Sequence, residues 1–371
     1  MKNIVTNRQI FFIIFLTLST YTSIDLPHTM AKTAGRSSWL IIIITALIFG
    51  LLSIVITKLN YTFQNKVLFD YSQEIVGKTF SKFIILFYLL FFIIIGVYLK
   101  LKLAGVITAH FLPKTPPPVI LFLSITLFGY VANKGITNIA RMFEIIGVLF
   151  LIVTIILCTA MLLQGISYNI MPFFNKSETR EYMKTFKDLF TPFTGLAVLF
   201  AIPFTSKNKK VSKVAFLTVL FIGLFYVLIV ESTIMIIGIN NTIAYKDAFI
   251  EAIKIVELPV IERTDIFYLT FGLMSLFSGK IIIYAVILEI ASKLFSNVKK
   301  YILAIIIGII FYILSIIGLN IKDLNSAYES FAPYLVILSS MVIPLSLLII
   351  SKLKKININN LENGESDNGM L

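Results

Sequence analysis

Long apolar runs separated by short polar stretches repeat along the whole chain of 371 residues. A hydrocarbon core about 30 Å thick needs around 20 apolar residues for one helix to cross it. Runs of this kind predict transmembrane helices over residues 8–30, 38–57, 83–107, 117–133, 140–165, 187–205, 211–239, 264–292, 300–319 and 329–351. The pattern therefore predicts an all-α integral membrane protein of about ten transmembrane helices.

The ten runs form one transmembrane domain over residues 1–353, followed by a polar cytoplasmic tail over 354–371. No small-residue cleavage site follows the first run, so we expect a retained helix rather than a signal peptide. Lys and Arg are more frequent in the loops on the side of both termini, which predicts that both are cytoplasmic. Two connections, Val67–Gly77 and Ile243–Leu258, are short amphipathic helices at the membrane interface or simple solvated loops.

Composition agrees with a lipid environment. Hydrophobic residues make up 58% of the chain and charged residues only 14%, against roughly 45–50% and 25% in soluble domains. The formal net charge of +13 comes from basic residues in short loops, where they meet anionic lipid headgroups. No continuous basic face with interleaved aromatic residues is present, so the predicted partner is membrane lipid and not nucleic acid.

Enzyme chemistry has little support in the sequence. The chain contains no Gly-rich phosphate loop and no HExxH, CxxC or GxSxG element. With His28, His110 and Cys158 as its only histidines and cysteine, a metal site or a catalytic triad is not expected. We therefore predict no enzyme activity, no cofactor and no metal.

The first apolar run of each half of the chain is interrupted. Ser19–Pro27 is a polar stretch that ends in proline, and Thr191–Gly195 combines Pro192 with glycine. Both segments are predicted to unwind near mid-membrane, where irregular backbone must line a protein cavity. Matching interruptions point to the binding site of an inverted-repeat transporter, although two ordinary proline kinks would produce the same pattern.

Polar side chains at these breaks are candidate ligands for a zwitterion such as an amino acid. Hydroxyl groups and open backbone come from Thr20, Thr22, Ser23, Thr191, Thr194 and Gly195. The same hydroxyls could instead bond to the preceding helical turn. Asp25 could hold an ammonium or a cation, or it could cap a half-helix that starts at Leu26.

Lys280 interrupts the apolar run 264–292 and cannot easily reach either surface. Alone in lipid it would cost roughly 2.5–3.5 kcal/mol, so it should face the bundle with Glu231 as its partner. The pair could be structural, or Lys280 could replace a bound cation. Ser275 and Ser278 lie on a similar face and are expected to line the same cavity. Tyr98 either borders this pocket or packs as an ordinary aromatic side chain.

Four short elements occur in order along the chain: Thr6-Asn7-Arg8-Gln9, the FLPKTP stretch 111–116, the YVANKGITNIAR stretch 130–141 and the ERTDIF stretch 262–267. Together they resemble the spore germination permease family, the B subunits of nutrient germinant receptors in endospore-forming bacteria. This family belongs to the amino acid–polyamine–organocation superfamily.

The resemblance implies two inverted five-helix repeats with helices 1 and 6 broken. It implies a complex with A and C subunits in the spore inner membrane, where the chain binds a small germinant such as an amino acid and triggers germination. An active amino acid permease coupled to protons or sodium is the alternative. The sequence departs from the family at Leu196-Ala197 and near Lys100 and Lys102, where acidic residues are common, so the charge of the pocket is unusual.

Overall fold

The computed structural model describes residues 5–22, 25–172, 186–257, 263–321 and 324–354. Its elements are α1 Asn7–Thr22, α2 Leu26–Ala34, η1 Gly35–Ser37, α3 Ser38–Thr62, α4 Leu68–His110, α5 Pro117–Asn133, α6 Ile136–Gln164, η2 Ser167–Ile170, η3 Phe186–Ala201, η4 Ser206–Asn208, α8 Val211–Ala244, α9 Ala248–Ile255, α10 Thr264–Leu294, α11 Lys300–Asn320, α12 Leu324–Ile337, η5 Leu338–Val342 and α13 Ile343–Leu353. The predicted tail falls outside these residues, apart from Lys354.

Seven helical spans are long and apolar enough to cross a membrane, and three shorter apolar helices accompany them at Asn7–Ser19, Pro117–Asn133 and Phe190–Ala201. Each of the ten predicted runs overlaps one of these segments. Many large apolar side chains on α5, α6 and α11 are exposed, which suits contact with lipid. The prediction of an all-helical integral membrane protein is confirmed.

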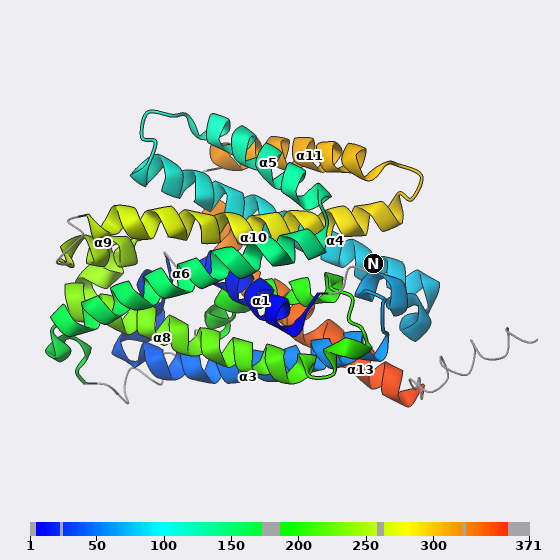
Figure 1. The fold of residues 1–371 in the computed structure, drawn as a ribbon, viewed down its shortest axis with the longest axis horizontal. Coiled ribbons are helices and arrows are strands. Elements are labelled where there is room, and N and C mark those ends of the chain that lie inside the picture. The colour runs from blue at the N-terminus through cyan, green and yellow to red at the C-terminus, as the bar shows by residue number, and fades with distance from the viewer. Residues whose placement is uncertain (1–4, 23–24, 173–185, 258–262, 322–323, 355–371) are drawn as a thin grey trace, which may run out of the picture.

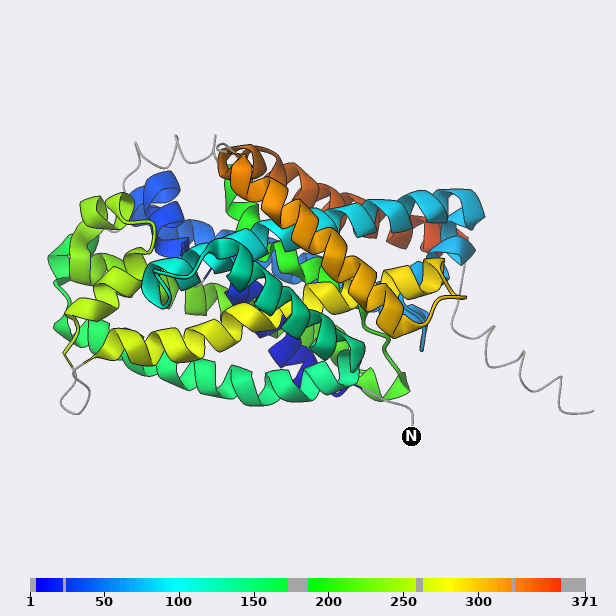
Figure 2. The ribbon, with the colours of Figure 1, turned by 90° about the horizontal axis from the view of Figure 1, so that it is seen from above.

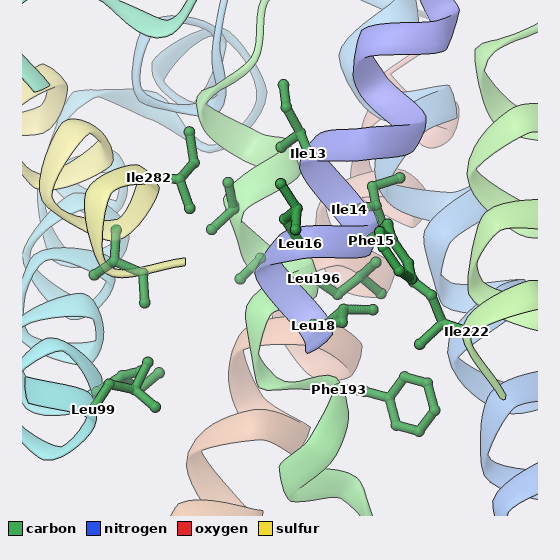
Figure 3. Packing of buried hydrophobic residues seen from close by; sticks show 14 of the residues in the cluster. Ile13, Ile14, Phe15, Leu16, Leu18, Leu99, Phe193, Leu196, Ile222 and Ile282 are labelled. Carbon is green, nitrogen blue, oxygen red and sulfur yellow. The ribbon is translucent and has the colours of Figure 1, made fainter. Parts of the chain in front are cut away.

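Helix α1 lies at the centre of the bundle, with longer helices around it (Figures 1 and 2). It contacts α6, α8, α10 and η3. Ile10, Phe15 and Leu18 are fully buried, and Figure 3 shows apolar side chains of α1 packed between η3 and the neighbouring helices. The described part of α1 that precedes the first break is therefore packed against other helices of the protein.

Helices α3 and α8 run side by side along one edge of the molecule (Figure 1). A Cβ atom on Gly223 of α8 would lie only 2.4 Å from the Cβ of Ala46 on α3. Helices in lipid associate through close packing of small residues, because burial from lipid adds little driving force. Gly223 thus permits the close approach of these two helices.

Two long helices bend at glycines with a positive φ. Gly77 in α4 has φ +83° and Gly238 in α8 has φ +76°, values that favour glycine because it lacks a Cβ. The predicted short helices Val67–Gly77 and Ile243–Leu258 correspond to the first turns of α4 and to α9. The apolar face of α9 is buried against protein, mainly α8 and α10, rather than left to the membrane interface.

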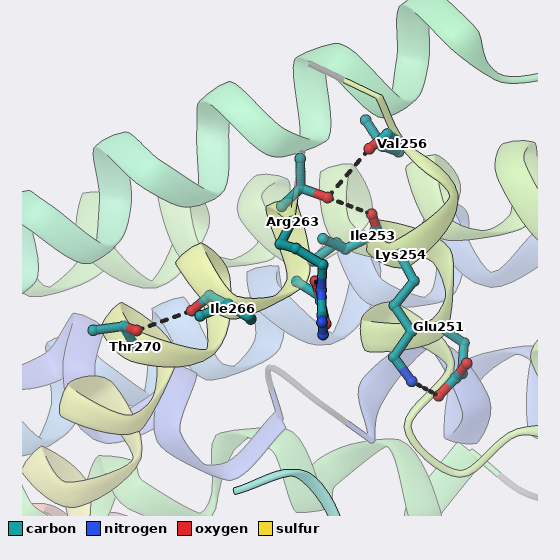
Figure 4. Close-up of polar contacts among 9 residues, drawn as sticks. Glu251, Ile253, Lys254, Val256, Arg263, Ile266 and Thr270 are labelled. Atoms are coloured by element: carbon teal, nitrogen blue, oxygen red, sulfur yellow. Dashed lines mark hydrogen bonds and ion pairs between the residues drawn. The ribbon is translucent and has the colours of Figure 1, made fainter. Parts of the chain in front are cut away.

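A pair of hydrogen bonds fixes α9 on the start of α10 (Figure 4). The hydroxyl of Thr264 donates to the carbonyl oxygens of Ile253 and Val256, at 2.7 and 3.2 Å. These carbonyls lie at the C-terminal end of α9, where the last C=O groups of a helix have no N–H partner within the helix. The first residue of α10 therefore supplies the hydrogen-bond donor for the last carbonyl groups of α9.

Candidate functional site at the break after α1

The first break separates α1, which ends at Thr22, from α2, which begins at Leu26 with Pro27 in its first turn. Thr20 and Thr22 lie in the last turn of α1, but their side chains and the whole of Ser23 fall outside the described residues. Asp25 occupies the N-cap position of α2 and makes no side-chain capping bond. The first N–H groups of α2 thus have no carboxylate cap from Asp25.

The second interrupted segment, η3, is a tight helical segment that contains Pro192 and packs on α1. The hydroxyl of Thr194 donates to the carbonyl oxygen of Thr191 at 2.5 Å, so this hydroxyl bonds within its own turn. A Cβ on Gly195 would lie 2.6 Å from Cγ2 of Thr17. Gly195 therefore has a packing role, because only a residue without a side chain fits against α1 here.

Asp25 forms an ion pair with Lys102 of α4. The two side chains are 27% and 28% exposed, so the pair is partly, not completely, buried. The ammonium of Lys102 also lies 4.9 Å from the ring centroid of Tyr98. Tyr98 in turn stacks on Tyr328 of α12, with ring centroids 3.7 Å apart and planes 14° apart. Residues from α2, α4 and α12 thus meet beside the break.

Two further lysines near this pair are almost completely buried. Lys280 of α10 is 2% exposed, and its charge is close enough to interact with those of Asp25 and Lys102. Lys100 of α4 is 1% exposed and interacts with Lys280. Its ammonium lies 2.8 Å from the ring centroid of Phe311. Neither Lys100 nor Lys280 forms an ion pair with any residue that the structure describes.

We call Asp25, Lys100, Lys102 and Lys280 the buried charge cluster. It holds three basic side chains and one carboxylate, and that carboxylate already pairs with Lys102. A charge removed from water is stable only when it is paired and hydrogen-bonded, or when it becomes neutral. The cluster therefore suits an added anionic group better than an added cation.

The predicted partner of Lys280 was wrong. Glu231 of α8 accepts a hydrogen bond from the hydroxyl of Ser38, with 3.2 Å between the two oxygens, and a second bond from the backbone of Trp39. The carboxylate of Glu231 thus accepts hydrogen bonds from the first turn of α3. Side-chain direction around α8, which the sequence pattern did not resolve, places Glu231 toward the start of α3.

The two serines of α10 are completely buried. The hydroxyl of Ser278 donates to the carbonyl oxygen of Met274 at 2.8 Å, one turn earlier in the same helix. Ser275 lies on the same well-buried stretch of α10. Both were predicted to line a cavity, and neither that role nor ligand binding by Tyr98 is tested by the geometry.

Lys102 is the residue of the candidate site that sequence reasoning missed. It was noted only as a departure from a family pattern, whereas it provides the partner of Asp25. A signal did exist, because Lys100 and Lys102 both fall late in a long apolar helix that has no neighbouring acid. Buried lysines in such a helix require a partner on another segment.

Comparison with known proteins identifies the family. The family model described as "Spore germination protein" matches residues 4–322. The chain belongs to this family. It is 25% identical over 364 residues to spore germination protein YndE of Bacillus subtilis strain 168, covering 95% of this chain and 97% of the relative. Spore germination protein KB of the same strain is 24% identical, with 94% of each chain covered.

A further relative, spore germination protein B2 of Bacillus subtilis strain 168, is 26% identical over 71% of this chain and 72% of its own length. Among solved structures, the crystal structure of MhsT in complex with L-phenylalanine matches with a TM-score of 0.64 and 14% identity. The match covers 92% of this chain and 97% of that one, and it shows a LeuT-like fold. The chain is a non-enzymatic membrane component of the spore germination family.

Proposed function

We propose that this protein is the membrane subunit of a spore germinant receptor, which binds a small nutrient and triggers germination. The ligand is an amino acid or a similar carboxylate-bearing molecule. Family membership supports the germination role. The observation that carries the ligand class is the excess of lysine over carboxylate, among the side chains that the structure describes, beside the break after α1.

The two ends of an amino acid match the two sides of this break. The last carbonyl groups of α1 offer partial negative charge to an ammonium, and the first N–H groups of α2 offer partial positive charge to a carboxylate. Lys280 then donates hydrogen bonds from its amino group to the carboxylate, and the carboxylate in turn stabilises the charged form of this lysine. Asp25 stays paired with Lys102 and keeps the local charge from repelling the ligand's ammonium.

The architecture proposed for this function is a ten-helix domain of two inverted five-helix repeats, with the first helix of each repeat broken. The site lies between α1, α2, α4, η3 and α10. Its proposed lining comprises Thr20, Thr22, Ser23, Asp25, Tyr98, Thr191, Thr194, Gly195, Ser275, Ser278 and Lys280. Glu231 does not belong to it, because it is bonded to the start of α3.

Binding would favour one packing of the helices around α1, and this bias would pass to partner subunits. The proposed partners are the A and C subunits of a germinant receptor, and the proposed location is the spore inner membrane. The curated relatives named as spore germination proteins support a role in this process.

An active amino acid permease is the second candidate. The likeness of the fold to MhsT favours it, because that structure holds an amino acid, L-phenylalanine. The two functions differ in whether solute crosses the membrane. Uptake of labelled amino acid into proteoliposomes, against its gradient and coupled to protons or sodium, would establish the permease instead of the sensor.

Direct binding tests the proposed ligand class. Purified protein is titrated with a panel of amino acids and, for any that binds, with the matching amide that lacks the carboxylate. We expect the amide and the Lys280→Met variant to lose binding by about tenfold or more, as for a lost charged partner. Lys32→Met, an exposed lysine of α2, is the matched control. Equal binding of acid and amide would contradict a carboxylate site at Lys280.

A further inference from the structure

A groove of about 510 Å³ lies between α5 and α11. Its walls come from these two helices and its floor includes Tyr284 of α10. The hydroxyl of Tyr284 donates to the carbonyl oxygen of Ala304 at 2.5 Å, so its polar atom is already bonded. The floor of the groove is consequently apolar toward anything that enters.

Two glycines keep the groove open next to the hydroxyl of Tyr284. A Cβ on Gly129 of α5 would lie 3.1 Å from the hydroxyl oxygen of Tyr284, and a Cβ on Gly308 of α11 would lie 3.0 Å from it. Larger side chains at either position would push into Tyr284 and fill the space. Toward the start of α5 the lining is aromatic, with Phe122 and Tyr312 in edge-to-face contact and their ring centroids 6.1 Å apart.

The end of the groove where α5 ends and α11 begins is different in chemistry. Tyr130 and Tyr301 line it and are 65% and 51% exposed. The ammonium of Lys134 lies 4.8 Å from the ring centroid of Tyr130, and Lys299 precedes the first turn of α11. In the described part of the chain, neither of these lysines has a carboxylate partner.

We propose that this groove binds an anionic phospholipid, with one acyl chain between α5 and α11 and the phosphate beside Lys134 and Lys299. Leu123 and Leu127 of α5, and Ile305 on α11, are exposed on the flanking surface, so the groove opens into hydrocarbon rather than water. Aromatic and basic side chains at its mouth are the groups that hold headgroups at a membrane interface. Its lining shares no residue with the proposed nutrient site, but its floor borders the buried charge cluster, because the ring centroid of Tyr284 lies 5.4 Å from the ammonium of Lys100.

The size of the groove favours an acyl chain over a helix of a partner protein. A helix with side chains is about 10–12 Å across and rises about 5.4 Å per turn, so one turn occupies roughly 500 Å³. The groove thus has room for about one turn, far less than a membrane-spanning helix. A flexible hydrocarbon chain fits such a space without requiring α5 and α11 to separate.

Native mass spectrometry of the full-length protein in detergent tests this proposal. The protein is mixed with phosphatidylglycerol or with phosphatidylcholine of the same acyl chains. Thr126→Trp places a large ring in the groove, and Leu127→Trp places the same ring on the neighbouring exposed position outside it. We expect Thr126→Trp to lose the phosphatidylglycerol-bound species and Leu127→Trp to keep it.

Charge variants test the headgroup separately. Replacing both Lys134 and Lys299 with Gln should weaken phosphatidylglycerol binding about thirtyfold and remove its advantage over phosphatidylcholine. Lys114→Gln, at the other end of α5, is the control and should change neither. Equal binding of the two lipids by the unaltered protein would overturn the proposal. So would loss of a dimer, rather than of lipid, in Thr126→Trp.

Discussion

The ion pair between Asp25 and Lys102 links the break after α1 to α4, and its contribution can be measured by a double-mutant cycle. The variants are Asp25→Asn, Lys102→Gln and the double replacement. Both side chains are about a quarter exposed. Exposed pairs contribute about 0.2–1 kcal/mol, whereas removing one partner of a fully buried pair costs about 3–5 kcal/mol. We expect a coupling free energy between these limits, at about 1–2 kcal/mol.

The assay is thermal or denaturant unfolding of the detergent-solubilised protein, followed by loss of helical circular dichroism. Each single replacement should destabilise the protein, and the double variant should be less destabilised than the sum of the two. Asp25→Asn combined with Lys32→Gln provides the control, because exposed Lys32 of α2 has no ion pair in the described residues. A coupling within about 0.5 kcal/mol of zero would refute the pairing, since independent sites add within that margin.

Three further predictions concern other contacts around the site. Gly195→Leu should destabilise the protein by about 1–3 kcal/mol, because its Cβ would meet Thr17; equal stability of the variant and the parent would contradict the close packing of η3 on α1. Phe311→Leu should cost about 2 kcal/mol, and less in a Lys100→Met background, because the cation–π contact is then already absent. Glu231→Gln keeps the hydrogen bond from the Ser38 hydroxyl and should change the free energy of unfolding by less than about 1 kcal/mol. A loss of about 3–5 kcal/mol would contradict this, because it would indicate that Glu231 is one partner of a buried ion pair.

The positions of the apolar helices followed from the sequence because lipid imposes a length on each apolar run, although only seven helical spans of the described residues are long enough to cross a membrane. The predicted run 117–133 coincides with α5, and the run 300–319 falls within α11. Boundaries were less accurate where charged residues continue a helix beyond the apolar part. Helix α4 begins at Leu68, well before the predicted start at residue 83, because amphipathic turns precede Gly77 and the helix then resumes.

The site was harder to predict because it depends on which way side chains point around long helices. Lys280 was correctly expected to be buried, but nothing in a uniformly apolar helix indicates which neighbour it faces. Glu231 and Lys102 both lie on long apolar helices, and only packing shows that the first meets α3 and the second meets Asp25. Thr194 was treated as a pocket hydroxyl, whereas its bond to its own turn is a local alternative that the sequence left open.

Germination of spores that lack this gene tests the central claim most directly. Complementing genes encode the unaltered protein, Lys280→Met or Lys32→Met, and spores are exposed to a panel of amino acids and their amides. We predict loss of the response to an amino acid without the gene, recovery with the unaltered protein and Lys32→Met, and no recovery with correctly inserted Lys280→Met. Full recovery with Lys280→Met, or an equal response to the acid and its amide, would contradict a nutrient site at the buried charge cluster.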